Sequence, residues 1–223
     1  MAIVCSQSFN GGGAVDDNNI ELTPILDPNA NPGTVACWAR LSELTNNFYT
    51  LYAKAAGTGT AVSFINARGP SAPSGADSYG TDMGGTLTSG GTASTDVDVW
   101  IFLSLTWSSG GSGTLNIYRN GTSIASSTRN PAAASGNCRI GSYMGLNTAN
   151  WHGEVAHAHF YDTNLSIPQL KQIMYRPGTI TSNLLAYYPL WDDSNTQRDL
   201  SGNGNDGTRS SSGEVTNSID GPI

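Results

Sequence analysis

The stretch Trp100-Ile-Phe-Leu-Ser-Leu-Thr-Trp107 decides the fold class, because its side chains alternate between two faces of an extended chain. The odd-numbered residues, from Ile101 to Trp107, share one apolar face, and the even-numbered ones share the other. A period of two over eight residues predicts a central β-strand. The run Thr114–Arg119 follows, and Asn120-Gly121 after it is a strong signal for a tight hairpin turn.

Similar short runs, separated by Gly, Pro, Asn and Ser, recur along most of the chain. Regular punctuation of this kind predicts an all-β sandwich or barrel. The stretches 67–98 and 106–114 lack strong periodicity and are predicted to be long surface loops with room for one edge strand. The predicted strands are Ile3–Phe9, Asn19–Leu22, Thr34–Leu41, Phe48–Ala53, Ala61–Asn66, Val99–Trp107, Thr114–Arg119, Arg139–Met144, Glu154–Tyr161 and Leu184–Leu190.

One short helix is predicted over residues 166–175. Ser166 is a natural N-cap and Gln169, three residues on, completes a capping box. Apolar residues recur on one face of this segment, and Pro177-Gly178 ends it. We expect the helix to cover one end of the sandwich.

Composition excludes several classes of function. The 223 residues include only 12% charged side chains and carry a net charge of −7, with ten scattered Lys and Arg, so a nucleic-acid partner is not expected. No window approaches the ~20 apolar residues of a membrane span. Nothing after Met1 resembles a signal peptide, which predicts synthesis in a cytosol.

The three cysteines, Cys5, Cys37 and Cys138, lie far apart, each within a strand-like run. We interpret them as buried thiols that act as small apolar side chains. One disulfide plus a free thiol is the alternative.

Several segments follow one another in a recognisable order. They are Ser8-Phe9-Asn10-Gly11 leading to Asp16-Asp17, Thr34–Arg40 with its Trp38, Trp100–Trp107 with Leu115–Gly121, Ile140–Tyr143, Trp151–Val155, Phe160-Tyr161 and Leu165-Ser166. In this order they resemble the segments of laminin-G-like, concanavalin-A-like domains. The resemblance implies an antiparallel two-sheet jelly-roll sandwich forming one domain over residues 1–223. The fold hosts lectins, glucanases, adhesion modules and virion proteins, so function has to be argued from a site.

The end of the chain departs from the family pattern. Leu184–Trp191, followed by Asp199-Leu-Ser-Gly-Asn-Gly-Asn-Asp-Gly207, resembles the segment that normally begins such a domain. We therefore predict a permuted domain, in which the C-terminal strand takes the place of the first strand and residues 184–223 pack onto the same domain.

Catalytic patterns are missing from the sequence. A sandwich glucanase needs two carboxylates presented from one strand into a groove, and only Asp96-Val97-Asp98 and the lone Glu154 come near that pattern. His157-Ala158-His159 places two rings on one face of a strand, but no further ligand stands at metal-binding spacing. We predict that the protein is not an enzyme and requires no cofactor.

Calcium is the one metal that the sequence suggests. Asp199, Ser201 and Asn203 fall at alternate positions of a calcium-loop pattern, although Ser210 stands where a bidentate Glu belongs. A self-bonded Asx turn explains the same residues without metal. Asp16 and Asp17 lie in a loop from which, by resemblance, this fold often ligates calcium. The candidate calcium ligands are thus Asp16, Asp17, Asp199 and Asn203.

A glycan is the candidate ligand of the loop from Gly141 to Trp151. Tyr143 and Trp151 bracket Asn147 there, and aromatic faces with amides suit a sugar. The alternative is that both rings pack beneath the loop.

The combined observations predict a structural protein, namely a capsid decoration, cement or fibre-type component of a bacteriophage virion. The chain resembles standalone proteins, often from phage, that close with the pattern Y-P-L-W…S-G-N-G-N-D-G. Its low charge and its Gly/Ser/Thr-rich loops suit contacts with protein, either copies of itself in a homo-oligomer or a capsid or tail lattice. The alternative function is that of a carbohydrate-binding module of a secreted or cell-surface protein.

Overall fold

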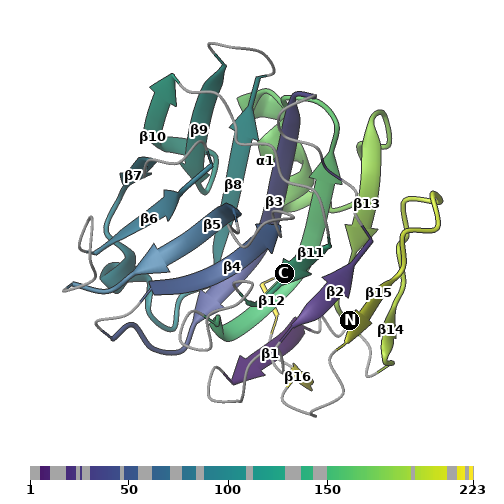
Figure 1. Cartoon of the computed structure of the whole chain (residues 1–223), viewed down its shortest axis with the longest axis horizontal. Helices are drawn as coiled ribbons and strands as arrows, with labels where there is room; N and C mark the ends of the chain where they lie inside the picture. Colours follow the sequence, from purple (N-terminus) through teal and green to yellow (C-terminus); the bar gives the residue numbers. More distant parts are fainter. Residues whose placement is uncertain are drawn as a thin grey trace.

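A computed structural model of the chain shows two antiparallel β-sheets packed face to face (Figure 1). The residues that it describes are 6–10, 19–23, 26, 31–45, 48–54, 62–70, 77–83, 88–108, 113–128, 137–142, 150–191, 194–209, 215–218 and 221–222. The predicted all-β, two-sheet jelly-roll sandwich is confirmed.

Sheet A holds the central strand predicted from the sequence. Its order is β10 (Thr122–Thr128), β9 (Thr114–Arg119), β8 (Ile101–Trp107), β3 (Gly33–Leu41), β12 (His152–Tyr161), β1 (Ser6–Asn10) and β16 (Val215–Ser218), and β13 (Leu184–Tyr188) also pairs with β12. Sheet B has the order β14 (Thr196–Gln197), β15 (Gly207–Arg209), β2 (Ile20–Leu22), β11 (Cys138–Ile140), β4 (Phe48–Lys54), β5 (Val62–Arg68), β6 (Ser78–Thr81) and β7 (Thr88–Gly90).

The alternation along β8 separates two apolar layers, as predicted. Ile101, Leu103, Leu105 and Trp107 lie in the core between the sheets, whereas Phe102 faces the opposite side of sheet A. Burial of each large apolar side chain contributes about 1.5–3 kcal/mol to the free energy of unfolding. This strand therefore ties both layers together.

The hairpin turn after β9 confirms the Asn-Gly signal, since Asn120 and Gly121 both have positive φ, 50° and 73°. The strand that follows, β10, was not predicted, because its short polar side chains show no apolar alternation. The prediction that 67–98 forms loops with at most one edge strand is wrong, since β6 and β7 lie there with a short 3-10 helix, η1 (Ala93–Asp96). Backbone pairing with neighbouring strands defines β6, which lies between β5 and β7, and β7, which lies at the end of sheet B. Such pairing leaves little trace in the sequence.

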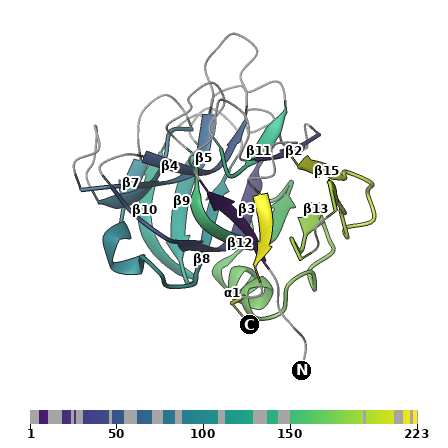
Figure 2. The ribbon, with the colours of Figure 1, turned by 90° about the horizontal axis from the view of Figure 1, so that it is seen from below.

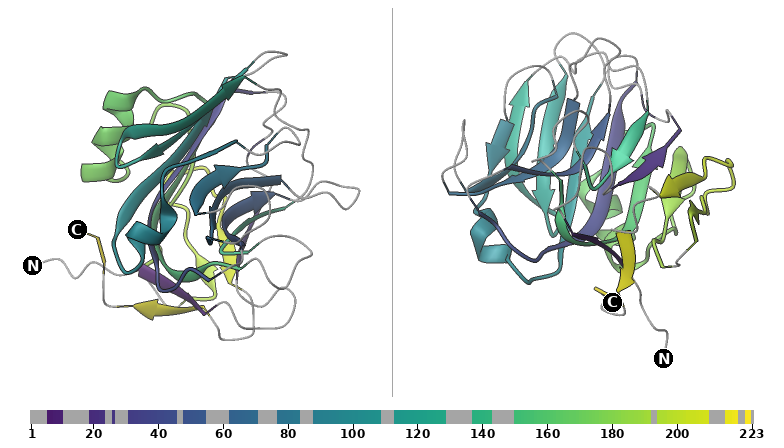
Figure 3. Two further views of the ribbon diagram at one scale, coloured as in Figure 1. Left: turned by 90° about the vertical axis from the view of Figure 1, so that its left-hand side faces the viewer. Right: turned by 60° about the horizontal axis from the view of Figure 1, so that its bottom comes forward.

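The predicted helix is α1 (Ile167–Tyr175), and Gln169 accepts a hydrogen bond from the Ser166 backbone N–H at 2.9 Å. Instead of covering one end of the sandwich, α1 packs on the face of sheet A that points away from sheet B (Figure 3). Leu170, Ile173 and Met174 are buried there in a second, smaller core. Within the described ranges, no helix has the length and apolarity needed to cross a membrane.

Strand β12 has one edge left after it pairs with β3, and two strands share that edge. β1 pairs with the residues from His152 to Val155, and β13 pairs with those from Ala158 to Tyr161. β16 then adds to the far side of β1 (Figure 2). β13 and β1 thus lie end to end along β12. Whether this arrangement is a permutation of the family order stays a prediction.

A β-bulge at His157 and Ala158 separates the two halves of that edge. His157 has a φ of +53°, and the register of β12 against β3 shifts at this point. Because a bulge adds one residue, the inward-facing side chains switch from Val155 to Ala158 and Phe160.

His157 and His159 of β12 are buried on the helix side of sheet A. The His159 ring stacks on Tyr187, with centroids 4.5 Å apart, and its Nε2 accepts a hydrogen bond from the Gly178 N–H. The His157 Nδ1 is hydrogen-bonded to the Tyr187 hydroxyl at 2.8 Å. Burial lowers the pKa of His157 to about 4 and that of His159 to about 3, so both rings are neutral at pH 7.

Cys37 and Cys138 are buried free thiols, as predicted, and burial raises the pKa of Cys37. Cys5 lies outside the described residues.

We expect acid to destabilise the fold. In the unfolded chain both histidines have a pKa near 6.5, whereas in the folded protein their pKa is about 4 and about 3. Below pH ~6.5 the unfolded state therefore binds protons that the folded state does not. The stability present above pH ~6.5 is lost as the pH falls toward the folded-state pKa values. The loss at pH ~5 is on the order of 2 kcal/mol per histidine. Denaturant unfolding at neutral and acidic pH measures it. His157→Asn, which tolerates the positive φ, should flatten the dependence, and an unchanged slope in that variant would contradict the assignment.

Deletion of residues 180–223 should unfold the protein, because it removes β13 from sheet A together with the buried Ala186, Tyr188 and Leu190. Circular dichroism and a thermal melt measure the outcome. A truncated chain that melts like the full-length one would show that the tail is an appendage and that the single-domain prediction over residues 1–223 is wrong.

Candidate functional site

The candidate site begins where the chain leaves the edge of β12. The last contact of this segment with β12 is a hydrogen bond of 3.2 Å from the His157 N–H to the Pro189 carbonyl. The edge of β12 before His157 is already paired with β1. The chain turns away at Leu190, which has a φ of +62° although it is not glycine. Such strain costs on the order of 1–3 kcal/mol and collects at functional sites. The Leu190 side chain stays buried in the core, while the next residue, Trp191, points outward.

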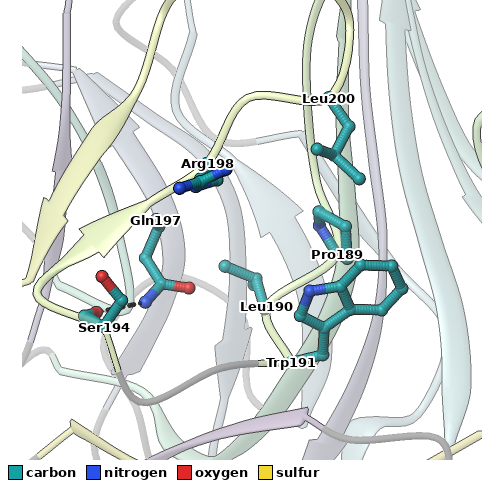
Figure 4. Close-up of a pocket in the computed structure, with 7 residues that line it drawn as sticks. All are labelled: Pro189, Leu190, Trp191, Ser194, Gln197, Arg198 and Leu200. Carbon is teal, nitrogen blue, oxygen red and sulfur yellow. Dashed lines mark hydrogen bonds between the residues drawn. The ribbon is translucent and has the colours of Figure 1, made fainter.

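A pocket of about 440 Å³ lies at this turn (Figure 4). Trp191 and Leu200 form part of its lining and are 52% and 49% exposed. They are two of the five large apolar side chains that are exposed in the described part of the chain. An exposed apolar pair beside a pocket of this size is typical of a ligand site. Its lining residues are Pro189, Leu190, Trp191, Ser194, Gln197, Arg198 and Leu200.

The wall opposite Trp191 is polar. Figure 4 shows Ser194, Gln197 and Arg198 across the pocket from the indole. Gln197 belongs to β14, is buried, and donates a hydrogen bond from Nε2 to the Ser194 carbonyl at 2.7 Å. The Arg198 side chain follows Gln197 and is exposed. The pocket therefore combines one aromatic face with amide, hydroxyl and guanidinium groups.

The Asp199 carboxylate fixes the backbone between Arg198 and Leu200, two residues that line the pocket. Its Oδ1 accepts hydrogen bonds from the backbone N–H groups of Tyr187 and Ser201, at 2.9 and 2.8 Å. Its Oδ2 accepts from the Ser201 hydroxyl at 2.7 Å and from the Asn205 N–H at 3.0 Å. The Leu200 N–H in turn donates to the Tyr187 carbonyl at 2.8 Å. These contacts fix Arg198 and Leu200 to β13.

Residues 201–205, Ser-Gly-Asn-Gly-Asn, add further hydrogen bonds to β13. Together with the contacts of Asp199 they form what we call the clamp. The Asn203 Nδ2 donates to the carbonyls of Leu184 and Leu185, at 2.7 and 3.1 Å. Gly202 and Gly204 have φ values of +90° and +75°, a region in which other residues are strained. Asp199, Leu200 and Asn203 thus form hydrogen bonds with backbone N–H and carbonyl groups of β13.

The hydrogen bonds of this segment account for Asp199 and Asn203 without a metal, and calcium binding at these two residues stays a prediction. Both carboxylate oxygens of Asp199 accept two hydrogen bonds each, and Asn203 turns its amide nitrogen, not its oxygen, toward its partners. Within the described ranges, no three His, Cys, Asp or Glu side chains form a metal-binding group. The Asx-turn alternative explains this segment. Asp16 and Asp17 lie outside the described residues, and calcium there stays a prediction.

The glycan contact predicted at Trp151 is wrong, because its side chain is fully buried in the core between the sheets. A ring without exposed surface cannot stack on a sugar. Tyr143 and Asn147, its predicted partners, lie outside the described residues. Of the five tryptophans, Trp191 is the exposed one. The sequence pattern of Leu184–Leu190 indicates only a strand and says nothing of Trp191. Pro189, two residues before Trp191, was the available signal that the strand ends there.

The carboxylates considered for glycoside hydrolysis serve as structural partners. Glu154 binds Arg40 through two hydrogen bonds of 2.8 and 2.7 Å. Asp96 is buried, binds Arg119, and accepts a hydrogen bond from the Tyr79 hydroxyl at 2.9 Å. Neither lines the pocket described above.

The two-sheet jelly roll and its aromatic pocket define a lectin-like β-sandwich. A model of the concanavalin A-like lectin/glucanases superfamily matches residues 11–171, and the chain belongs to that superfamily. The match ends before the pocket, which lies within residues 189–200. No curated protein matches the chain.

Solved structures share the fold at low sequence identity. One is a protein from Bacteroides ovatus with an inferred carbohydrate-binding role, 18% identical with a TM-score of 0.73; the match covers all of this chain and 62% of that one. Another is domain 4 of a GH43 extracellular arabinanase from Geobacillus stearothermophilus in complex with arabinotriose, 17% identical over 75% of each chain with a TM-score of 0.54. A heptameric pentraxin from Limulus polyphemus is 16% identical, covers 78% of this chain and 83% of its own, and has a TM-score of 0.54.

We expect Asp199→Asn to lower the free energy of unfolding by about 2–4 kcal/mol, because its amide group cannot accept all four hydrogen bonds. Asp98→Asn is the matched control, since Asp98 is exposed and Asn tolerates its positive φ; it should change stability by less than ~0.5 kcal/mol. Denaturant titration measures both. EDTA should leave the melting temperature unchanged, and a melting temperature that calcium restored after chelation would establish a calcium site.

Proposed function

We propose that the protein binds carbohydrate in the pocket beside Trp191. The observation that carries the proposal is the half-exposed indole facing a polar wall of Ser194, Gln197 and Arg198. A sugar ring has an apolar face, which suits an aromatic side chain, and a rim of hydroxyls, which suits the exposed Ser194 hydroxyl and Arg198 guanidinium. The pocket volume of about 440 Å³ is within the range of small-ligand sites.

The pocket supports binding rather than cleavage. Acid-assisted hydrolysis of a glycoside needs two carboxyl groups on either side of the bond, ~5–9 Å apart. No carboxylate belongs to the described lining of the pocket. A binding module without chemistry is therefore the function that these side chains support.

The related structures favour carbohydrate binding over a protein-attachment role. The Bacteroides ovatus protein has an inferred carbohydrate-binding role, and the arabinanase domain is in complex with arabinotriose. The virion role, with capsid or tail proteins or further copies of the chain as partners, stays a prediction, as does extracellular localisation for a carbohydrate-binding module.

The test is a glycan array probed with the full chain and with Trp191→Ala. We expect the variant to bind its glycans at least about tenfold more weakly, because it loses the apolar area on which the sugar stacks. Tyr175→Ala is the matched control, since it removes an aromatic ring that is 69% exposed on α1, outside the pocket. Both variants should keep the wild-type melting temperature. Binding that survives Trp191→Ala, or an array without hits, would contradict the proposal.

A further inference from the structure

We infer that the pocket selects sugars that carry a carboxylate, with Arg198 as the residue that recognises the charge. This inference rests on the proposed function and adds the chemical class of the ligand. A guanidinium matches a carboxylate with two parallel hydrogen bonds, which gives both affinity and orientation.

The first support is that the Arg198 guanidinium forms no ion pair with another described residue. Elsewhere in the protein, Arg40, Arg119 and Arg139 each bind a carboxylate of the chain itself. Among the described residues, no carboxylate forms a salt bridge or hydrogen bond with Arg198. Its charge is therefore available to a ligand, and the energetic cost of breaking an internal ion pair does not arise.

The second support is that the backbone carrying Arg198 is fixed on both sides. Before it, Gln197 pairs with Gly207 between β14 and β15, and the Gln197 side chain is buried. After it, Asp199 is tied to β13 through the carboxylate clamp. Because this backbone is already held in place, only the Arg198 side chain has to be ordered when a ligand binds, which limits the entropic cost of binding.

The third support is the combination of apolar and charged surface in one pocket. Trp191 and Leu200 present apolar surface on one side of the pocket. A ligand seated against that surface would displace water from it, and an ion pair formed there would be stronger than one in bulk water. A carboxylate on a sugar ring that stacks on Trp191 would face Arg198, because the two side chains lie on opposite sides of the pocket (Figure 4).

Because of the overall charge of the chain, attraction of an acidic sugar would have to come from contacts within the pocket. With a net charge of −7, the protein as a whole repels anions at long range. A preference for acidic sugars therefore has to come from a contact at the site. Asp192 and Asp193, next to Trp191 in the sequence, lie outside the described residues, and a direct comparison of charged and neutral ligands includes whatever they contribute.

The experiment compares each uronic-acid oligosaccharide with its own methyl ester, which keeps the ring and removes the charge. By isothermal titration or array binding, we expect the acid to bind the full chain at least about tenfold more tightly than the ester, with an advantage that shrinks as the ionic strength rises. Arg198→Gln should bring acid and ester to within about twofold of each other. Arg198→Lys should keep part of the preference, because it keeps the charge and loses the planar fork.

Arg176→Gln is the matched control, since Arg176 is an exposed arginine outside the pocket. It should leave the preference for the acid unchanged. Equal or weaker binding of the acid relative to the ester would overturn the inference, as would binding confined to sulfated sugars. Each of these outcomes leaves Trp191-dependent glycan binding intact. Loss of the proposed function itself would appear separately, as the absence of any Trp191-dependent binding.

Discussion

The edge of β12 that lies opposite β3 is the constraint on which the rest of the structure depends. One strand edge serves two partners, β1 along its first half and β13 along its second, and the bulge at His157 and Ala158 separates them. Since both partners run in the same direction, β13 cannot continue past Pro189 without meeting β1. The strained turn at Leu190 is the consequence, and it is this turn that brings Trp191 out of the sheet.

A strand that leaves its sheet early exposes backbone groups, and the segment from Asp199 to Asp206 satisfies them. The Asp199 carboxylate accepts the Tyr187 N–H, the Leu200 N–H binds the Tyr187 carbonyl, and the Asn203 amide binds the carbonyls of Leu184 and Leu185. Buried backbone groups that remained unpaired would each cost about 1–3 kcal/mol. The same clamp that stabilises β13 also positions Arg198 and Leu200, so stability and site geometry have one origin.

The location of the pocket separates fold from function in this protein. The superfamily match covers residues 11–171, whereas the pocket is built by the segment that follows α1. Membership of a fold that hosts many functions therefore says little about the ligand. The pocket itself is shaped by the turn at Leu190 and by β14 and its continuation into Arg198.

The sequence by itself determined the class of fold, because the alternation from Trp100 to Trp107, the Asn120-Gly121 turn and the cap at Ser166 are local properties of the chain. It also placed Cys37 in the core, since its face follows from the period of its strand. Only the tertiary structure decided which tryptophan is exposed: Trp151 and Trp191 both lie close to the end of a strand, but Trp151 is buried in the core between the sheets, whereas the turn at Leu190 leaves Trp191 exposed. The same holds for Asp199 and Asn203, whose spacing suits either calcium or a clamp. The choice depends on the backbone N–H and carbonyl groups of β13, which are distant in sequence, and no local pattern records that they are near.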